Sequence, residues 1–299
     1  MRIDPNNDPY KHYLSKSRLN TFSFCKKKYY IEYILGIKSE ANYNMIVGSR
    51  YHEWIDMVMK HILDYPPNLW MNFITPSYTP YERDMMEWTI KNEIERYKRT
   101  YHINPDYFVP YSTEGLYLNH EHQLRGYIDR IDLICPSMFS YMSKDVGKTI
   151  CSRTMNHLID NMSSKRKQLL ICEYKTGKKS ISDYYFLKNM KFELSFYKYM
   201  ISGLPEFKDC DFPCACLINP QSKEIVYIDF VRDSTVEKVI NEFRSCEVFE
   251  PEKCSERKYI RCGGCKTSDE AGLYKVKQED IERELNGEIP DSWESNVYI

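Results

Sequence analysis

The sequence predicts an α/β (α+β) fold, because strand-like and helix-like hydrophobic patterns alternate along one chain of 299 residues. Short apolar runs at residues 169–175 and 214–219 are typical of buried strands. Longer stretches at residues 45–63 and 182–202 repeat apolar residues every three or four positions, which predicts amphipathic helices. With 42% hydrophobic residues, the chain has enough apolar material for one large domain or two modest ones.

The remaining elements follow from the same patterns. A helix is expected from about residue 14, with Ser15 or Ser17 as its N-cap. Gly48 stands near the start of the next helix, where a small residue lets another element approach closely. We also expect helices at 26–37, 80–101 and 234–246, strands at 114–118, 122–134 and 224–231, and loops at 64–79 and 102–113.

The strand at 169–175 ends in Glu173-Tyr174-Lys175 and is followed by a turn at Thr176-Gly177. Side chains alternate between the two faces of a strand, so Glu173 and Lys175 point the same way. A carboxylate there can hold a divalent metal ion, and a neighbouring ammonium can orient a water or stabilise a developing negative charge. The alternative is an ordinary surface ion pair, which contributes little to stability.

Three further positions carry polar groups in apolar surroundings. Asp129 lies in the middle of an apolar strand, which is unfavourable unless the carboxylate is paired or functional, and simple alternation puts it on one face with Ile131. His52 follows Gly48 by one helical turn, and its alternative role is structural. Glu193 and Tyr197 are one turn apart on a helix and share a face.

The order of these motifs resembles the PD-(D/E)xK nuclease superfamily, and more narrowly its RecB-nuclease and Cas4-like branch. The resemblance rests on Gly48 with His52, on Gly126-Tyr127-Ile128-Asp129 and on Glu173-x-Lys175 before Thr176-Gly177. The branch continues with a Gln-x-x-x-Tyr helix, where this chain has Glu193 and Tyr197. The resemblance covers roughly residues 14–265 and implies a restriction-endonuclease-like core, with a mixed central sheet flanked by helices.

The resemblance also implies an activity. A nuclease of this kind hydrolyses DNA phosphodiester bonds, and single-stranded DNA or DNA ends are the expected substrate. His52, Asp129, Glu173 and the Tyr174 backbone carbonyl would hold Mg²⁺ or Mn²⁺, and an imidazole ligand favours Mn²⁺. Lys175 would position the water, while Tyr197 and Glu193 would orient Lys175 or the DNA.

Two alternatives are a non-catalytic nucleic-acid-binding protein and an interaction subunit of a recombination or replication complex. Both would keep the nuclease fold. An intact set of Asp129, Glu173 and Lys175 speaks against the first of them, because a site without catalytic function need not retain all three.

The chain has eleven cysteines, which in an intracellular protein are not expected to form a disulfide framework. By the resemblance, Cys25 would join Cys254, Cys262 and Cys265 around a [4Fe–4S] cluster. Here Cys254 precedes the Cys262-x-x-Cys265 pair, whereas the branch has its third cysteine after that pair. Four thiolates suit Zn²⁺ equally well, so zinc is the alternative.

Charge is unevenly distributed along the chain, although the net charge is only −1. Residues 277–299 carry seven acids and two bases and form an acidic tail of net charge −5. We expect the basic residues Lys26, Lys27, Lys178 and Lys179 to bind nucleic acid. The predicted partners are DNA and, beyond it, recombination, replication or CRISPR-adaptation proteins.

The expected organisation is a single nuclease domain over residues 1–276. It would contain an insertion at about 135–167, where hydrophobicity is low, and would be closed by a cysteine-rich metal-binding segment at 246–265. Neither an apolar stretch of membrane-spanning length nor a signal-peptide pattern is present, so a soluble, cytoplasmic protein is expected.

Overall fold

The structure is a computed structural model, which describes residues 9–10, 12–34, 43–134, 166–177 and 184–245. Its backbone contacts divide the chain into two units. The first comprises Met1–Leu19 and Ala41–Ser245, and the second comprises Asn20–Glu40 and Cys246–Ile299. Most of the predicted insertion, the cysteine-rich segment at 246–265 and the acidic tail at 277–299 lie outside the described residues.

The first unit is built on a mixed sheet of seven strands. The sequence predicts a mixed sheet but only five of these strands, because the two-residue strands Leu14–Ser15 and Cys210–Asp211 are too short to carry a period. The main path runs β1-β3-β4-β6-β7, with β2 also paired to β3 and β5 also paired to β4. Pairs β1–β3, β4–β5 and β4–β6 are parallel, and pairs β2–β3, β3–β4 and β6–β7 are antiparallel. The strands are β1 (Leu14–Ser15), β2 (Pro110–Asn119), β3 (Leu124–Ile134), β4 (Lys167–Tyr174), β5 (Cys210–Asp211), β6 (Ala215–Asn219) and β7 (Glu224–Ile228).

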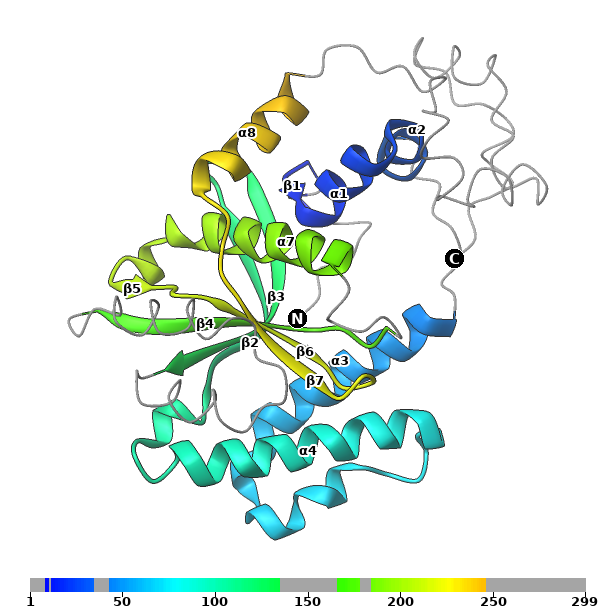
Figure 1. Cartoon of the computed structure of the whole chain (residues 1–299), viewed down its shortest axis with the longest axis vertical. Helices are drawn as coiled ribbons and strands as arrows, with labels where there is room; N and C mark the ends of the chain where they lie inside the picture. Colours follow the sequence, from blue (N-terminus) through cyan, green and yellow to red (C-terminus); the bar gives the residue numbers. More distant parts are fainter. Residues whose placement is uncertain (1–8, 11, 35–42, 135–165, 178–183, 246–299) are drawn as a thin grey trace. The chain divides into compact units, whose positions relative to one another are not determined.

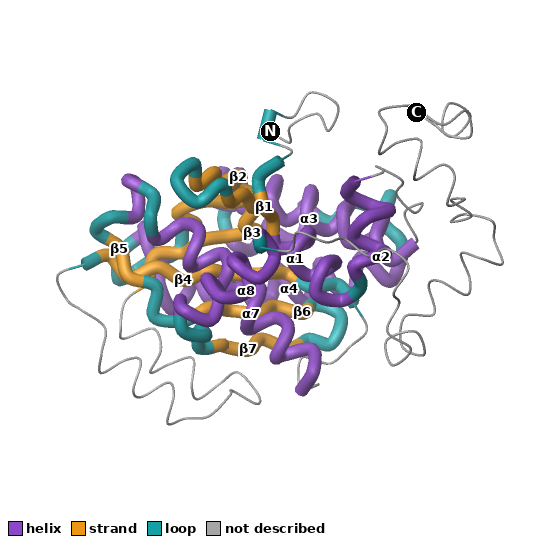
Figure 2. The backbone as a smooth tube through the Cα atoms, turned by 90° about the horizontal axis from the view of Figure 1, so that it is seen from above, coloured by secondary structure: helices purple, strands orange, loops and turns teal. Residues whose placement is uncertain are grey.

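Helices cover both faces of this sheet. Figure 1 shows α7 (Tyr184–Ser202) and α8 (Asp233–Arg244) on one side, with α3 (Tyr43–His61) and α4 (Pro80–Thr100) on the other. Figure 2, seen from above, shows α7 lying over the strands. Each face has its own buried cluster: Leu194 and Ile240 pack on the α7 side, and Trp54 and Ile90 pack on the α4 side. The sheet is therefore the middle layer of three.

Local sequence signals explain where two helices begin. Thr79 and Glu82 form a capping box at the start of α4, because each side chain accepts a hydrogen bond from the other residue's backbone N–H. Ser15 Oγ accepts from the Arg18 backbone N–H at 3.3 Å, which agrees with the predicted cap of α1 (Lys16–Phe24). Caps of this kind contribute about 1 kcal/mol each.

The expected loops at 64–79 and 102–113 were partly wrong. The first contains a 3₁₀ helix, Pro67–Phe73, and the second contains the first residues of β2. Trp70 is fully buried, stacked on Phe108 with ring centroids 5.6 Å apart. A short 3₁₀ helix whose single fully buried side chain is Trp70 has no hydrophobic period that the sequence could reveal. Among the described residues, the other 3₁₀ turns are Ile62–Asp64, Pro105–Tyr107 and Pro205–Phe207.

Strand β3 has an open stretch along one edge. Strand β2 pairs with one edge of β3 over nearly its whole length. Strands β1 and β4 therefore share the other edge, where β1 pairs with Leu124 and Arg125 and β4 pairs from Arg130 onward. Residues 126–129 lie between these two ladders, with no strand of the described part of the chain registered on that edge. The opening ends at Asp129.

Side-chain alternation also breaks at this point. Ile128 and Ile131 pack in the same buried cluster, although they are three residues apart. The expectation that Asp129 and Ile131 share one face of a regular strand was therefore wrong, because regular alternation does not continue through Asp129 and Arg130. The irregularity lies beside the open edge of β3 and changes the face of the strand from which the Asp129 carboxylate projects.

The described residues of the second unit are aromatic and basic. Helix α2 (Lys26–Tyr29) continues as a short π-helix, Tyr30–Ile34. Tyr29 packs edge-on against Phe22 at 5.5 Å and stacks on Tyr33 at 5.3 Å. Across both units, none of the described helices is both long enough and apolar enough to cross a membrane.

Candidate active site

Asp129 and Glu173 meet where strands β3 and β4 separate. Their ladder ends at the pair Arg130–Cys172, and its register would next bring Asp129 opposite Glu173. Asp129 Oδ2 accepts a 2.7 Å hydrogen bond from the Tyr174 backbone N–H, which attaches the end of β4 to β3. The structure thus brings together two carboxylates that are 44 positions apart in the sequence.

Glu173 is held by two ammonium groups. Lys175 Nζ donates to Glu173 Oε1 at 2.6 Å, as alternation along the strand predicts, and Lys16 Nζ donates to the same oxygen at 2.8 Å. Burial alone would raise the pKa of Glu173, but Lys16 and Lys175 outweigh it and bring this pKa to about 2. Glu173 Oε2 is buried and has no hydrogen-bond partner within the described residues.

Lys16 also links Glu173 to helix α7. Its Nζ lies 2.8 Å from Glu193 Oε2 and 4.8 Å from the centre of the Tyr197 ring, so Glu193 and Tyr197 share a face as predicted. Lys175 is more distant from Glu193, at 3.8 Å. Burial lowers the pKa of Lys16, but the negative charges of Glu173 and its neighbours raise it well above its usual value. Lys16 is therefore a fixed positive charge.

Tyr197 occupies space that a glycine leaves open. A Cβ atom on Gly126 would lie only 2.8 Å from Cε1 of Tyr197 and 3.2 Å from the end of Met200. Gly126 therefore lets α7 bring Tyr197 close to the open edge of β3. Burial, followed by the charge of Glu173, raises the pKa of Tyr197 well above its usual range, so its hydroxyl is neutral.

Helix α3 supplies His52 on the other side of Asp129. Nδ1 of His52 lies 2.9 Å from Glu114 Oε1 and 3.5 Å from Asp129 Oδ1. Burial lowers the pKa of His52, but Asp129 and Glu114 raise it above its ordinary value. The helix approaches the turn after β4 closely, since a Cβ atom on Gly48 would lie 3.2 Å from Thr176 Oγ1. This close approach agrees with the expectation for Gly48.

Glu114 adopts an unusual backbone conformation. Its φ is 44°, in the left-handed region, although it lies within strand β2. The register pairs Thr113 with Arg130 and Gly115 with Ile128, so Glu114 is opposite Asp129. A strained non-glycine residue beside two polar groups is typical of a functional site.

These residues fit a divalent cation. Four carboxylates (Glu114, Asp129, Glu173 and Glu193) surround two lysines and one histidine. Burial, and then the charge of Glu173, raises the pKa of Asp129 to about 7, so a second ionised carboxylate beside Glu173 is costly without a further cation. Within the described residues, one group of three donors, His52, Glu114 and Asp129, has its ligand atoms within 4.8 Å of one another. Carboxylate donors suit Mg²⁺ and Mn²⁺, and an imidazole donor favours Mn²⁺ of the two. Glu173 Oε2 offers one more buried oxygen.

Lys16 and Glu114 were missed by sequence reasoning. Lys16 reaches the site because β1 pairs with β3, and a two-residue strand has no periodic signal. Glu114 would have been found had the β2–β3 register been known, since it is opposite Asp129. No spacing in the sequence marks either residue.

The predicted cysteine site falls mainly outside the described residues, as Cys254, Cys262 and Cys265 all do. Cys25 is a free, partly exposed thiol whose Sγ accepts from the Lys28 backbone N–H at 3.5 Å. The cluster and its zinc alternative stay predictions.

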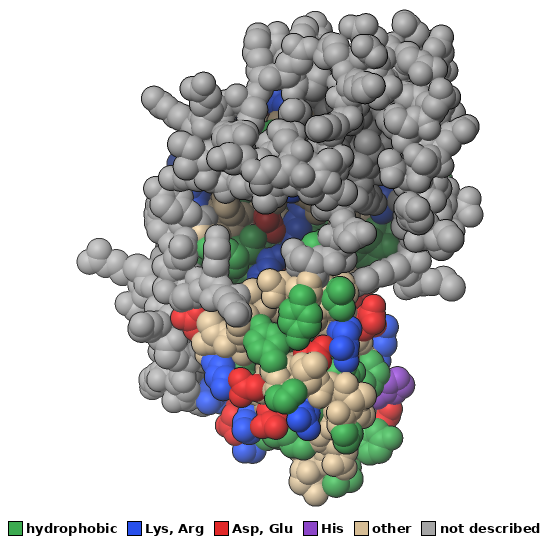
Figure 3. Space-filling model, turned by 90° about the vertical axis from the view of Figure 1, so that its right-hand side faces the viewer, with side chains coloured by type: hydrophobic (Ala, Val, Ile, Leu, Met, Phe, Trp, Pro, Cys, Tyr) green, Lys and Arg blue, Asp and Glu red, His purple; other side chains and the backbone are tan. Residues whose placement is uncertain are grey.

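The predicted nucleic-acid-binding lysines are also largely undescribed. Lys178, Lys179 and the Lys27 side chain lie outside the described part, and Lys26 Nζ lies 5.4 Å from the centre of the Phe22 ring. On the described part of the face in Figure 3, acidic, basic and hydrophobic side chains are interspersed.

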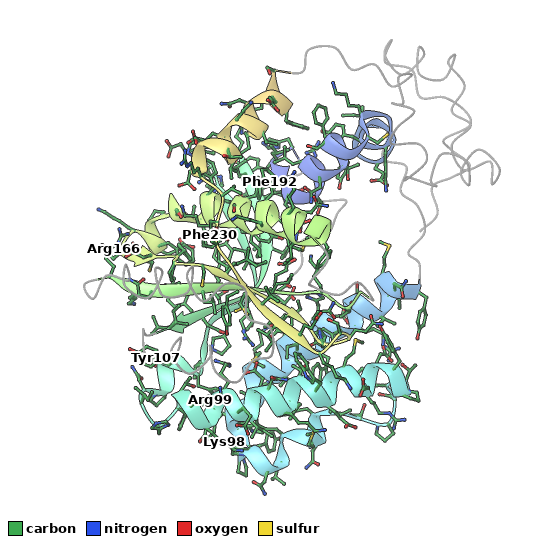
Figure 4. All side chains as sticks on the ribbon, viewed as in Figure 1. Lys98, Arg99, Tyr107, Arg166, Phe192 and Phe230 are labelled. Atoms are coloured by element: carbon green, nitrogen blue, oxygen red, sulfur yellow. The ribbon has the colours of Figure 1, made fainter. Side chains whose placement is uncertain are left out.

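A second charged group lies on the α4 side of the same strands. We call Arg130, Glu93, Asp132 and Arg96 the Arg130 cluster. Arg130 binds Glu93 at 2.8 Å and Asp132 at 3.0 Å, and Arg96 binds Glu93 at 2.6 Å. A cavity of about 210 Å³ adjoins it, lined also by Arg99 of α4, which Figure 4 labels.

Comparison with known proteins gives one family. The family model of the PD-(D/E)XK nuclease superfamily matches residues 13–138. The matched segment contains Lys16, His52, Glu114 and Asp129 and ends before Glu173. Members of this superfamily are usually phosphodiesterase nucleases that use Mg²⁺ or Mn²⁺, and a mixed sheet flanked by helices fits their core. No curated protein matches the chain.

Proposed function

We propose that this chain is a metal-dependent DNA nuclease that hydrolyses phosphodiester bonds. One observation carries the proposal: the fold brings Asp129, Glu173, Lys175 and His52 from three elements and one strand end to a single point. The family match over residues 13–138 supports it. A buried excess of carboxylates is costly to the fold, and a divalent cation would compensate for it.

His52, Asp129, Glu173 and the Tyr174 carbonyl would hold Mg²⁺ or Mn²⁺, with Glu114 as a further donor. The bound ion would lower the pKa of a water and neutralise the phosphate. Lys175 is the more exposed of the two lysines, at 27% against 15% for Lys16, and so can reach a phosphate oxygen or hold the attacking water. Glu114 accepts from His52 and fixes the orientation of its ring.

The narrower assignment is to the RecB-nuclease and Cas4-like branch, acting on single-stranded DNA or DNA ends. Its support is that Glu193 and Tyr197, the positions of that branch's helical motif, contact the same lysine as Glu173. With it come a [4Fe–4S] cluster or Zn²⁺ at Cys25, Cys254, Cys262 and Cys265. It also brings possible partners in recombination, replication or CRISPR adaptation. Iron, sulfide and zinc analysis of the purified protein separates the two metal assignments.

The test is cleavage of end-labelled single-stranded and double-stranded DNA with Mn²⁺ or Mg²⁺. The wild-type protein should shorten single-stranded DNA, and Lys175→Ala should lose about 100-fold or more in rate. Lys198→Ala is the matched control. Lys198 lies on α7, but its ammonium pairs with Asp233 rather than with a residue of the candidate site. Equal cleavage by wild type and Lys175→Ala, or inactivity of the wild type with every metal and DNA end, would contradict the proposal.

The second candidate is a nucleic-acid-binding protein without catalysis. It would bind DNA with the same affinity in chelator and in Mn²⁺, because its binding would not need the ion. If the protein is a metal-dependent nuclease, it should bind DNA more tightly with Mn²⁺, since four carboxylates repel the phosphate backbone when the ion is absent. Binding by the inactive Lys175→Ala protein, measured with and without Mn²⁺, separates the two.

A further inference from the structure

We propose that the Lys16 ammonium occupies the position between Glu173 and Glu193 where a second divalent cation would otherwise bind, so that the site takes up a single metal ion. The inference rests on the proposed metal-dependent function and deepens it. It concerns one residue of this chain, on an element that the sequence did not mark.

The geometry around Lys16 is that of a cation enclosed by carboxylates. Its Nζ lies 2.8 Å from Glu173 Oε1 and 2.8 Å from Glu193 Oε2. The side chains of Glu173 and Glu193 are only 4% and 11% exposed, so bulk water solvates neither carboxylate well. A buried point shared by two carboxylate oxygens attracts a cation, whether it is an ammonium or a metal ion.

Lys16 is held in place by its backbone. It follows directly after β1, where Leu14 and Ser15 pair with Leu124 and Arg125. It is also the first residue of α1, whose first turn is capped by Ser15. The ammonium additionally lies over the Tyr197 ring at 4.8 Å. Both the backbone and the ammonium group of Lys16 are held by contacts, so Lys16 differs from a mobile surface lysine.

Glu173 uses its two oxygens differently. Oε1 accepts from both Lys16 and Lys175, whereas Oε2 is buried and has no hydrogen-bond partner in the described structure. The grouped donors His52, Glu114 and Asp129 belong to other elements and do not contact Lys16 in the described hydrogen bonds. One ion among those donors is therefore compatible with the Lys16 ammonium on Glu173 Oε1.

The test counts bound ions rather than cleavage. Isothermal titration calorimetry and Mn²⁺ electron paramagnetic resonance on the full chain should give one Mn²⁺ per chain for the wild type. Lys16→Met keeps the bulk of the side chain but removes its charge, and should bind a second Mn²⁺. Lys16→Arg keeps the charge and should bind one. Lys191 lies elsewhere on α7 and pairs with Asp229. Lys191→Met breaks that ion pair and should also bind one Mn²⁺.

The double variant Lys16→Met/Glu193→Gln shows whether Glu193 is a ligand of the additional ion. It should return to one Mn²⁺ per chain. A wild-type protein that binds two ions in this cluster, or a Lys16→Met protein that binds only one, overturns the proposal. A second ion that persists in the double variant overturns it as well.

Lys16→Met removes a buried counterion and is expected to destabilise the metal-free protein. If the metal-free variant is unfolded, its thermal melting is followed against Mn²⁺ concentration. Recovery of a cooperative transition in Mn²⁺, but not in the same ionic strength of KCl, supports the proposal, because the ion replaces the ammonium. Failure of Mn²⁺ to restore folding overturns it.

The two proposals fail separately. A wild-type protein that binds one Mn²⁺ and leaves DNA intact contradicts the nuclease function but not the role of Lys16. A protein that cleaves DNA and binds two ions contradicts only the role of Lys16.

Discussion

Two charged clusters lie back to back on strands β3 and β4. Asp129 belongs to the candidate active site, whereas the next residue, Arg130, is the centre of the Arg130 cluster. Glu173 and Tyr174 are divided in the same way, since the Tyr174 hydroxyl accepts from Arg130. Neighbouring residues of two strands thus serve two different environments.

The two clusters differ in charge balance. In the Arg130 cluster, two arginines face the two carboxylates of Glu93 and Asp132. In the candidate active site, four carboxylates face two lysines and His52. Balanced buried pairs can maintain a structure without help, but an acidic excess costs stability unless a cation joins it. This difference agrees with a structural role for the Arg130 cluster and with the proposed metal-binding role of the candidate active site.

The largest effect is expected when the acidic excess is reduced. Asp129→Asn should lower cleavage about 1,000-fold or more, because it removes a ligand charge. In metal-free protein at pH 8 it should instead raise the free energy of unfolding by roughly 1 to 3 kcal/mol, since one repelling carboxylate is gone. Cleavage rates and urea denaturation measure the two effects. A metal-free Asp129→Asn protein with a lower free energy of unfolding than the wild type would contradict the comparison.

Breaking the balanced cluster should do the opposite. Arg130→Met leaves Glu93 and Asp132 buried without their main counterion, and should lower the free energy of unfolding by about 3 to 5 kcal/mol. Urea denaturation measures the change. Lys98→Met is the control, because that lysine pairs with Glu95 at the surface of α4 and should change stability by less than about 0.5 kcal/mol. Similar effects for both variants would show that the Arg130 cluster is not structural.

Acid should weaken the same cluster. Burial raises the pKa of Glu93, but Arg96 and Arg130 lower it below its ordinary value. Ionised Glu93 therefore stabilises the fold above its unfolded pKa, and this contribution disappears as the pH falls through the lower folded pKa, below about pH 4. Glu93→Gln should flatten the pH dependence of stability in that range by about 1 to 3 kcal/mol. An unchanged acid limb contradicts this assignment.

The smallest expected effect concerns the space beside Tyr197. Gly126→Ala places a Cβ atom 2.8 Å from the Tyr197 ring, so α7 must shift and stability should fall by about 1 to 2 kcal/mol. Gly177→Ala is the control, because a Cβ atom there has no neighbour within 4 Å among the described residues. Thermal melting and cleavage are measured together. If Gly126→Ala changes neither, the close approach of Tyr197 does not matter to the site.

Much of the fold and part of the site could be predicted from the sequence. The bounds of α4 and α7 differ from the predicted ones by at most two residues, since long amphipathic helices carry a strong period. The pair Glu173 and Lys175 was predicted to point one way, and the 2.6 Å contact confirms it, because alternation along a strand is local geometry. The helix around Trp70 was missed, because its cause is a ring buried against distant Phe108.

By itself, the sequence predicted His52, Asp129 and the pair Glu173 and Lys175 as site candidates and the elements on which they lie, since these predictions follow from local periodicity and residue type. Only the tertiary structure decided what surrounds them. Lys16 depends on a two-residue strand joining β3, and Glu114 depends on the register of β2. Which charges are balanced and which are in excess is likewise set by contacts between distant segments. Burial makes the unbalanced charge unfavourable, and burial depends on tertiary packing that the sequence alone does not show.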